Sequence, residues 1–308
     1  MTKRYTIFLK YQPPFNWRES LSFLAFRKVN GLEQVTPTTY RRSISVGANI
    51  GLMELDFRDA DNSHAVALSI VLTAEQHDQQ NQDKQSTSDY IVNNVRRMFD
   101  LDADSETIDT SLMSVLKPAQ GPDFPYIKGL RIAGTWSAYE AGVRAILGQQ
   151  VTVKQSIKLL SLFVSELGAS IDTGQLRNSD TAFEPFQYVF PEPAVVADSA
   201  LEFLKMPGAR KDCLRAFSQY MAALNKEEKG TQFSTQDCND WLAIKGIGAW
   251  TRDYSRIRGL GESDVFLSGD AVVKNALSKL AQYSGLIDTN AAKPWRSYLN
   301  LQLWRSES

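Results

Sequence analysis

The residues best suited to chemistry lie in one segment, WLAIKGIGAWTRDYSRIRGLGESDVFLSGD, which runs from Trp241 to Asp270. Asp270 ends a glycine-rich connection and precedes the apolar helical pattern AVVKNALSKL. An aspartate there is a favoured N-cap, and its carboxylate stays ionised in the field of the helix N-terminus. A fixed carboxylate can also stabilise positive charge that develops in a transition state. Local sequence leaves open whether Asp270 only caps the helix or also acts in catalysis.

The same segment contains a candidate phosphate-binding turn, Lys245-Gly246-Ile247-Gly248. Two glycines around an aliphatic residue allow a tight reversal, with Ile247 buried between the helices that it joins. Such a reversal leaves backbone N–H groups at a helix N-terminus without internal partners, where an anion can bind. A plain helix-to-helix turn is the simpler interpretation of these glycines.

The helix expected after this turn, near 249–258, has two different faces. Arg252 and Arg256 share one face at i, i+4, while Trp250, Tyr254 and Ile257 share the opposite face. One side could approach phosphates while the other lines a pocket or a core.

Composition excludes several other classes of protein. His64 and His77 are the only histidines, and Cys213 and Cys238 the only cysteines, so histidine triads, histidine metal sites and four-thiolate clusters have too few residues. The 34 basic and 35 acidic side chains give a formal charge of −1, so any binding of nucleic acid must be local. Without a membrane-spanning or signal-peptide pattern, we expect an intracellular, cytoplasmic protein that needs no membrane.

The hydrophobic pattern predicts an α+β protein with a boundary at residue 89. Residues 1–89 contain alternating strand patterns and one helix near 17–29, which indicates an antiparallel α/β domain. Residues 75–89 have no apolar side chain and are expected to form an exposed connection. Residues 90–308 read as all-helical apart from a loop at 170–193. Helices are expected near 90–100, 136–148, 151–168, 198–205, 208–225, 236–243, 249–258, 270–283 and 291–306.

Together, the hairpin, the amphipathic helix, the glycines and the terminal aspartate resemble the helix-hairpin-helix, Gly/Pro-rich loop, Asp signature of base-excision DNA glycosylases. Further matches resemble the AlkA-type 3-methyladenine DNA glycosylase II family: YQPPFNW, RAILGQQVTV, VFLSGD, KPWRSY and LQLW. They are spread over nearly the whole chain. The resemblance implies an N-terminal domain like the TATA-binding protein, followed by a helical region in two lobes with the active-site cleft between them.

That resemblance also implies a function: excision of alkylated purines, of the 3-methyladenine and 7-methylguanine type, from duplex DNA to leave an abasic site. Asp270 matches the essential carboxylate. Bifunctional relatives carry a nucleophilic lysine where this chain has Trp250, which favours a monofunctional enzyme without lyase activity. The base pocket corresponds to Phe23, Trp250, Tyr254 and Trp304, although core packing is the alternative for Phe23 and Trp250.

DNA contacts follow from the same resemblance. Gln150 matches the residue that fills the gap left by the flipped nucleotide, against the alternative that Gln149 and Gln150 merely link two helices. No cofactor or metal is required, although the carbonyls of Gly246 and Gly248 could hold a monovalent cation. The expected DNA-binding residues are Lys245, Gly246, Ile247, Gly248, Arg252 and Gln150.

Two departures from the enterobacterial type leave the lesion range open. Ala271 and Arg305 stand where aromatic residues are expected, so the pocket could be wider or more polar. Within enzymes, a glycosylase for oxidised or deaminated bases is the closest alternative. Outside enzymes, a non-catalytic helix-hairpin-helix scaffold would bind DNA without cleaving a bond. The expected partner is damaged double-stranded DNA, bound by a bacterial monomer that needs no protein partner.

Overall fold

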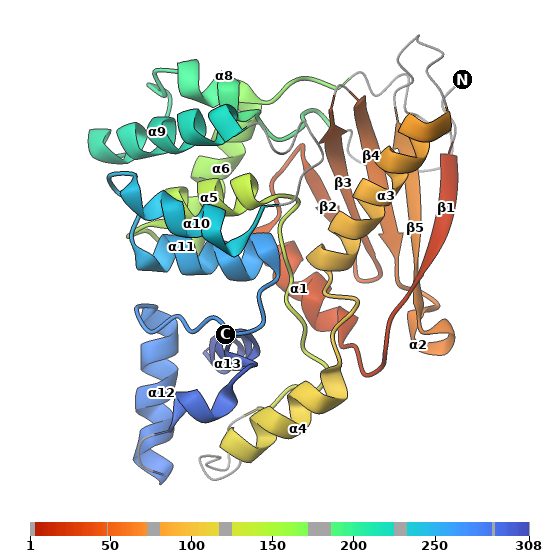
Figure 1. Cartoon of the computed structure of the whole chain (residues 1–308), viewed down its shortest axis with the longest axis vertical. Helices are drawn as coiled ribbons and strands as arrows, with labels where there is room; N and C mark the ends of the chain where they lie inside the picture. The colour runs from red at the N-terminus through yellow and green to blue at the C-terminus, as the bar shows by residue number, and fades with distance from the viewer. Residues whose placement is uncertain are drawn as a thin grey trace.

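The computed structural model describes residues 4–47, 49–72, 81–116, 125–171, 186–224, 233–284 and 287–307. Its N-terminal part contains one antiparallel sheet with the strand order β1-β5-β4-β3-β2 (Figure 1). Buried and half-exposed side chains alternate along β4, as expected when one face of a sheet covers a core. The strands are β1 (Arg4–Lys10), β2 (Glu33–Val35), β3 (Thr39–Val46), β4 (Asn49–Asp56) and β5 (Ala65–Leu72).

Three helices accompany this sheet: α1 (Trp17–Arg27), the short α2 (Ala60–Ser63) and α3 (Asn81–Met98). Apolar residues of α1 and of α3 pack with strand residues in one buried cluster. The prediction of an exposed connection is wrong from residue 81 onward, because α3 begins there; residues 75–80 lie outside the described residues. Packing of the apolar half of α3 stabilises the whole helix, its polar first turns included.

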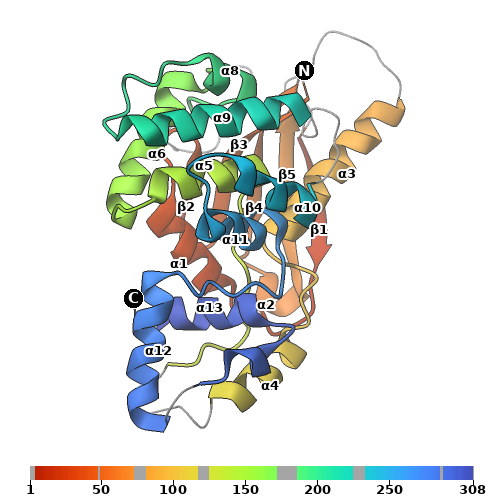
Figure 2. The same cartoon turned by 60° about the vertical axis from the view of Figure 1, so that its left-hand side comes forward.

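The rest of the described chain is helical, as predicted for an α+β protein. In Figure 2 some of these helices lie in front of the sheet and others lie below it. They are α4 (Ser105–Leu116), α5 (Ala138–Gly148), α6 (Val153–Leu167), α8 (Pro193–Asp198), α9 (Gly208–Leu224), α10 (Thr235–Asp240), the 3-10 turn η2 (Trp241–Ala243), α11 (Ala249–Ser255), the π-helical η3 (Arg256–Leu260), α12 (Ala271–Ser284), the 3-10 turn η4 (Thr289–Ala292) and α13 (Arg296–Arg305).

The helical region has two separate hydrophobic clusters. One joins α5, α6, α8, α9 and the residues around η2, and the other joins α4, α12 and α13. Helix α11 lies between them, since Ile247 before it packs in the first cluster and Trp250 in it packs against the second. This arrangement confirms the predicted two-lobed helical region.

Some local predictions are wrong. The expected helix at 198–205 is absent, because the helix occupies 193–198, starts at Pro193 and ends before Leu201, whose φ is +53°. Proline is well suited to the first position of a helix, and a left-handed residue ends one. Helix α4 was not predicted, and most of the loop predicted at 170–193 lies outside the described residues. Among the described helices, none has the length and apolar character needed to cross a bilayer.

Candidate active site

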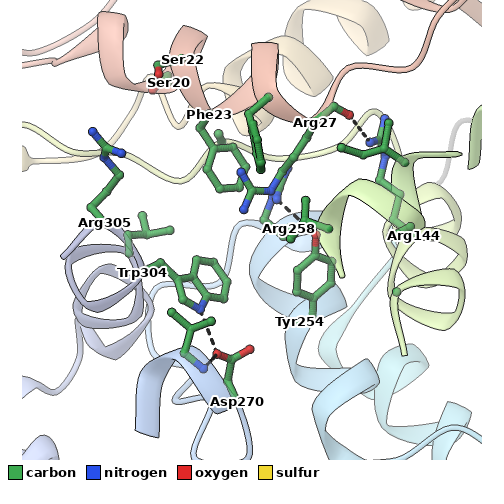
Figure 3. A pocket seen from close by; sticks show the side chains of 18 of the residues that line it. Ser20, Ser22, Phe23, Arg27, Arg144, Tyr254, Arg258, Asp270, Trp304 and Arg305 are labelled. Carbon is green, nitrogen blue, oxygen red and sulfur yellow. Dashed lines mark hydrogen bonds between the residues drawn. The ribbon is translucent and has the colours of Figure 1, made fainter. Parts of the chain in front are cut away.

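A cavity of about 710 Å³ opens where α1 meets both lobes of the helical region (Figure 3). Its lining comes from α1, the segment around Leu130, the facing ends of α5 and α6, α11 with η3, the start of α12 and the end of α13. Of the sequence-predicted site residues, five line this cavity: Phe23, Trp250, Tyr254, Asp270 and Trp304.

The carboxylate of Asp270 is fixed by four N–H donors. Oδ1 accepts hydrogen bonds from the backbone of Val272 at 3.0 Å and Val273 at 3.1 Å, which caps α12. The same oxygen accepts the indole N–H of Trp304 at 3.2 Å, and Oδ2 accepts that of Trp250 at 2.9 Å. Asp270 is 9% exposed and lines the cavity, so it is neither turned to bulk solvent nor sealed from it. Capping and access to the cavity therefore coexist in this one side chain.

Helix α13 holds the loop that presents Asp270. Ser297, Asn300 and Trp304 lie on one face of that helix at i, i+3, i+7. Ser297 Oγ accepts the N–H of Val265 at 3.0 Å, and Asn300 Oδ1 accepts the N–H of Leu267 at 3.1 Å. Because these buried side chains satisfy loop amides before Asp270, the carboxylate sits on a rigid support.

Three aromatic rings form one wall of the cavity. The rings of Trp250 and Tyr254 are stacked, with centroids 5.3 Å apart and an interplanar angle of 24°. Tyr254 is tilted against Trp304 at a centroid distance of 6.4 Å. Trp295, nine residues before Trp304, instead packs against Tyr298 in the second hydrophobic cluster. The indole of Trp304 thus faces the cavity, as its helical position predicts.

Phe23 contributes a ring from the N-terminal domain, but guanidinium groups cover it. The Cζ atom of Arg27 lies 3.8 Å from the ring centroid, and that of Arg258 lies 4.5 Å away. These are favourable cation–π distances. A base that stacked on a covered face of Phe23 would have to displace a cation.

Residues 244–249 form the expected hairpin. Ile247 is buried and packs in the first helical cluster, while Lys245, Gly246 and Gly248 are exposed. Gly246 has φ +99°, and a Cβ there would lie 2.9 Å from Cys213, so only glycine fits. Gly248, the N-cap of α11, has φ −102° and open space where a Cβ would point. A ligand can therefore approach the backbone closely at Gly248.

The two arginines on the outer face of α11 and η3 are already paired. Arg252 binds both carboxylate oxygens of Asp253, with Nε–Oδ1 at 2.7 Å. Arg256 binds Glu262 through two nitrogens and also contacts Asp253. A phosphate at Arg252 would compete with this pairing. The net positive charge on this face of α11 and η3 is therefore smaller than the two arginines alone would give.

Gln149 and Gln150 have different environments. Gln149 Nε2 donates to the Gly246 carbonyl at 3.0 Å and to Thr251 Oγ1 at 3.1 Å, so it ties the end of α5 to the hairpin. Gln150 is exposed and has φ +54°, an uncommon conformation for a residue with a side chain. The linking role thus falls to Gln149, while Gln150 directly precedes Val151, which lines the cavity.

The carbonyl oxygens of Gly246 and Gly248, which were expected to be able to hold a monovalent cation, both accept hydrogen bonds within the protein. The Gly246 carbonyl accepts from Gln149, and the Gly248 carbonyl accepts the N–H of Arg252 at 3.1 Å. Within the described residues, no group of three or more histidine, cysteine or acidic side chains could hold a metal ion.

Ala271 and Arg305, the two residues that depart from the enterobacterial type, lie in different places relative to the cavity. Ala271 is exposed and does not line the cavity. Arg305 does line it, and its Nε lies 2.8 Å from Glu19 Oε2, which joins α13 to α1. The prediction of a more polar pocket rests on Arg305 alone.

Sequence reasoning missed four basic residues of the cavity, Arg27, Arg131, Arg144 and Arg258. Arg258 follows Tyr254 by one helical turn, and this spacing was the available signal. Arg144 belongs to a buried network in which its guanidinium binds Glu33 at 3.0 Å and Glu140 at 2.7 Å. The neighbouring arginines outweigh burial and lower the pKa of Glu140 to about 2.

Comparison with known proteins finds similar sequences among DNA glycosylases. Residues 6–137 match the family model of the AlkA N-terminal domain. The chain is 29% identical to DNA-3-methyladenine glycosylase 2 of Escherichia coli, over 97% of this chain and 96% of that protein. The expected resemblance to AlkA-type 3-methyladenine DNA glycosylases is confirmed.

Another named relative and two solved structures are also similar to this chain. A probable bifunctional transcriptional activator/DNA repair enzyme AlkA of Mycobacterium tuberculosis is 28% identical over 96% of this chain and 56% of its own length. The fold matches that of a 3-methyladenine DNA glycosylase from Archaeoglobus fulgidus with a TM-score of 0.68 and 16% identity, over 97% of both chains. An 8-oxoguanine glycosylase/lyase of Clostridium acetobutylicum, solved with double-stranded DNA, matches with a TM-score of 0.54 and 14% identity, over 90% of this chain and 97% of that one.

Proposed function

We propose that this AlkA-like protein is a monofunctional DNA glycosylase that excises alkylated purines from duplex DNA. One observation carries the proposal: Asp270, the sole carboxylate bound by two indole N–H groups among the described residues, lies at the floor of an aromatic-walled cavity. Breaking an N-glycosidic bond builds positive charge on the deoxyribose, and a pre-fixed carboxylate stabilises that charge chiefly in the transition state.

The leaving base needs little acid catalysis in this reaction. A purine alkylated at N3 or N7 is cationic and departs without strong protonation. Trp250, Tyr254 and Trp304 supply aromatic surface against which the flipped base can stack. Asp270 would also orient the attacking water.

Duplex DNA would bind along the hairpin and the adjoining loop. Amides around Gly248 would contact a phosphate beside the lesion, with Lys245 nearby, and Gln150 would fill the gap in the duplex. The named AlkA relatives and the fold shared with a glycosylase that was solved on DNA support this arrangement. The bound state as a monomer, the boundary at residue 89 and a bacterial cytoplasmic location stay predictions.

The absence of a suitable lysine supports a monofunctional reaction. Lys245 is exposed on the hairpin, and no lysine lines the cavity among the residues that the structure describes. A Schiff base with the sugar requires an amine within reach of the reacting carbon.

The test is excision from three DNA substrates: methylated, oxidised and deaminated duplexes. We expect free methylated purines and intact strands with abasic sites, which become cleaved only after alkali. Release confined to oxidised or deaminated bases would favour the alternative glycosylase classes. Binding without release from any substrate would favour the non-catalytic scaffold, and strand cleavage without alkali would contradict a monofunctional mechanism.

A further inference from the structure

One guanidinium group in the cavity lacks adequate partners within the protein. Arg258 is 2% exposed, and its Nη1 donates to the hydroxyl of Tyr254 at 3.3 Å. Its Nε is buried without any hydrogen bond. Leaving a buried charged donor unsatisfied costs folding free energy, which the cation–π contact with Phe23 offsets only in part.

The charges around Arg258 do not compensate it. Arg42 and Arg144 pair with Glu33 and Glu140 in the buried network, which balances two positive charges against two negative ones. Arg27 and Arg258 remain as an excess of positive charge beside the Phe23 ring. Burial lowers the pKa of both arginines, that of Arg27 to about 10, and like-charge repulsion from Arg144 adds to this effect.

Other charged side chains of the lining have partners. Glu19 pairs with Arg305, and Glu307 pairs with Lys279 at 2.7 Å. Arg131 donates to backbone carbonyls, that of Asp100 at 2.8 Å among them. What remains is the Asp270 carboxylate on one side and the Arg27–Arg258 pair on the other, with Tyr254 and Trp304 between them (Figure 3). The cavity is therefore electrically polarised.

The backbone places Arg258 at this point. Residues Arg256–Leu260 form a π-helical segment after α11. Such segments rotate the residues that follow and are frequent at functional sites. Arg258 comes to lie over Phe23, while Ile257 is buried in the second hydrophobic cluster.

Resting on the proposed function, we propose that Arg258, with Arg27 beside it, binds a carbonyl oxygen on the edge of the flipped base. The site would then prefer purines with a 6-oxo group over purines with a 6-amino group. A guanidinium has only donors, so it satisfies a carbonyl acceptor, whereas an exocyclic amine would bring donor against donor. Guanine-derived lesions thus fit the polarised cavity better than adenine-derived lesions carrying the same alkyl group.

The decisive experiment compares 3-methylguanine with 3-methyladenine, two lesions alkylated at the same atom. Single-turnover release of both bases from methylated DNA is measured for the wild type and for Arg258→Met. Because a hydrogen bond to a charged group contributes about 1.5–3 kcal/mol, the rate ratio of 3-methylguanine to 3-methyladenine should fall about 10-fold or more in the variant. Release of 3-methyladenine should fall less than release of 3-methylguanine.

Stability provides a readout that separates recognition from a structural role. Removing an unsatisfied buried charge should leave the melting temperature of Arg258→Met equal to or above that of the wild type. Arg58→Met is the matched control, because Arg58 is exposed, pairs with Asp56 and does not line the cavity. It should leave the release ratio unchanged.

Several outcomes would overturn the inference. They are an unchanged ratio, an equal loss of both activities with a lower melting temperature, or a uniform loss of affinity for all duplexes, which would indicate a phosphate contact. A measurement on the wild type needs no variant: free hypoxanthine should inhibit excision at lower concentration than free adenine, and equal inhibition would contradict the inference. If the wild type released no base from methylated DNA, the proposed function would fail, and binding of the two free bases would still test Arg258.

Discussion

The indole N–H of Trp250 donates to Asp270 Oδ2 at 2.9 Å and thereby joins the hairpin helix to the start of α12. Trp250 is the second residue of α11, two positions after the N-cap Gly248. The first turn of α11 therefore connects two parts of the site. It carries the Gly248 backbone, which is proposed to bind a phosphate, and Trp250, which holds the Asp270 carboxylate proposed to act on the sugar. Binding of DNA at the hairpin would fix the position of the reacting sugar relative to Asp270.

Asp270→Asn should lower excision by at least about 100-fold, the range found when one preorganised electrostatic group is removed from an active site. The amide oxygen can still cap α12 through Val272 and Val273, so the fold should persist. Binding to a duplex with an abasic-site analogue should be retained. Rates of base release and Kd for that duplex check the prediction, and equal loss of both would indicate a purely structural cap.

Trp250→Phe should separate positioning of the carboxylate from stacking. The phenyl ring keeps a surface for Tyr254 but cannot donate to Asp270. Since hydrogen bonds to charged groups contribute about 1.5–3 kcal/mol, we expect kcat to fall about 10- to 100-fold with little change in duplex affinity. Trp304→Phe removes the longer 3.2 Å bond and should cost less. An equal or reversed order would contradict the ranking of the two donors.

Gly248→Ala is the sharpest probe of the hairpin. Alanine tolerates φ −102°, and its Cβ would meet no protein atom, so a weaker complex would report on the space that a phosphate occupies. Affinity should fall to a similar degree for damaged and undamaged duplexes, with at most a small drop in melting temperature. Gly208→Ala, which also has open space, is the control. Unchanged DNA affinity would remove the hairpin from the interface.

Gly246→Ala is unsuitable as a DNA-binding test. Its φ of +99° and the 2.9 Å approach to Cys213 mean that a methyl group strains the backbone and collides with the core. We expect a lower melting temperature and lost affinity together. The two glycines of the motif therefore differ in role. Gly246 is required by the backbone conformation, whereas Gly248 leaves open surface for a ligand.

Local sequence signals predicted the fold class, whereas the catalytic role of Asp270 came from the resemblance to the glycosylase signature. Hydrophobic period separates the strands from the helices, and Asp270 combines a cap position with a glycine-rich approach. Trp304 could be assigned to the cavity side because helical geometry fixes its angle to Trp295.

Tertiary pairing could not be predicted in the same way. The neutralisation of Arg256 by Glu262 depends on a turn that returns after η3. The bond from Arg144 to Glu33 joins residues 111 positions apart. The spacing of Arg258 from Tyr254 places both residues on one helix face, but its burial without a partner for Nε depends on tertiary packing.

Asp100 should make stability depend on pH. Burial raises its pKa to about 6, although its Oδ2 accepts bonds from Tyr298 Oη at 2.8 Å and from the N–H of Ile132. The folded state therefore holds this proton above the pH at which the unfolded chain releases it. The contribution to stability is full below pH about 4 and is lost as pH rises to about 6, by up to about 3 kcal/mol.

Asp100→Asn removes this titration and keeps an oxygen acceptor for both donors. The free energy of unfolding of the variant, relative to the wild type, should therefore rise between pH 4 and 6 and level off above. Urea titrations across this range check the sign, because other titrating groups cancel in the difference. A difference that stays constant with pH would show that Asp100 is not the group responsible.

Gln150→Ala should reveal whether this side chain holds the duplex open. Gln150 has a left-handed backbone conformation and precedes the cavity residue Val151 in the chain, whereas Gln149 forms the link to the hairpin. Losing a wedge matters most when the lesion is stably paired, because flipping then costs the most free energy. We expect excision to fall more for a lesion in a matched pair than for the same lesion opposite a mismatch.

Gln150→Gly relieves the φ of +54° without restoring the side chain, so it should show the same selectivity with a higher melting temperature than Gln150→Ala. Equal losses on both duplexes would assign Gln150 to general DNA binding instead.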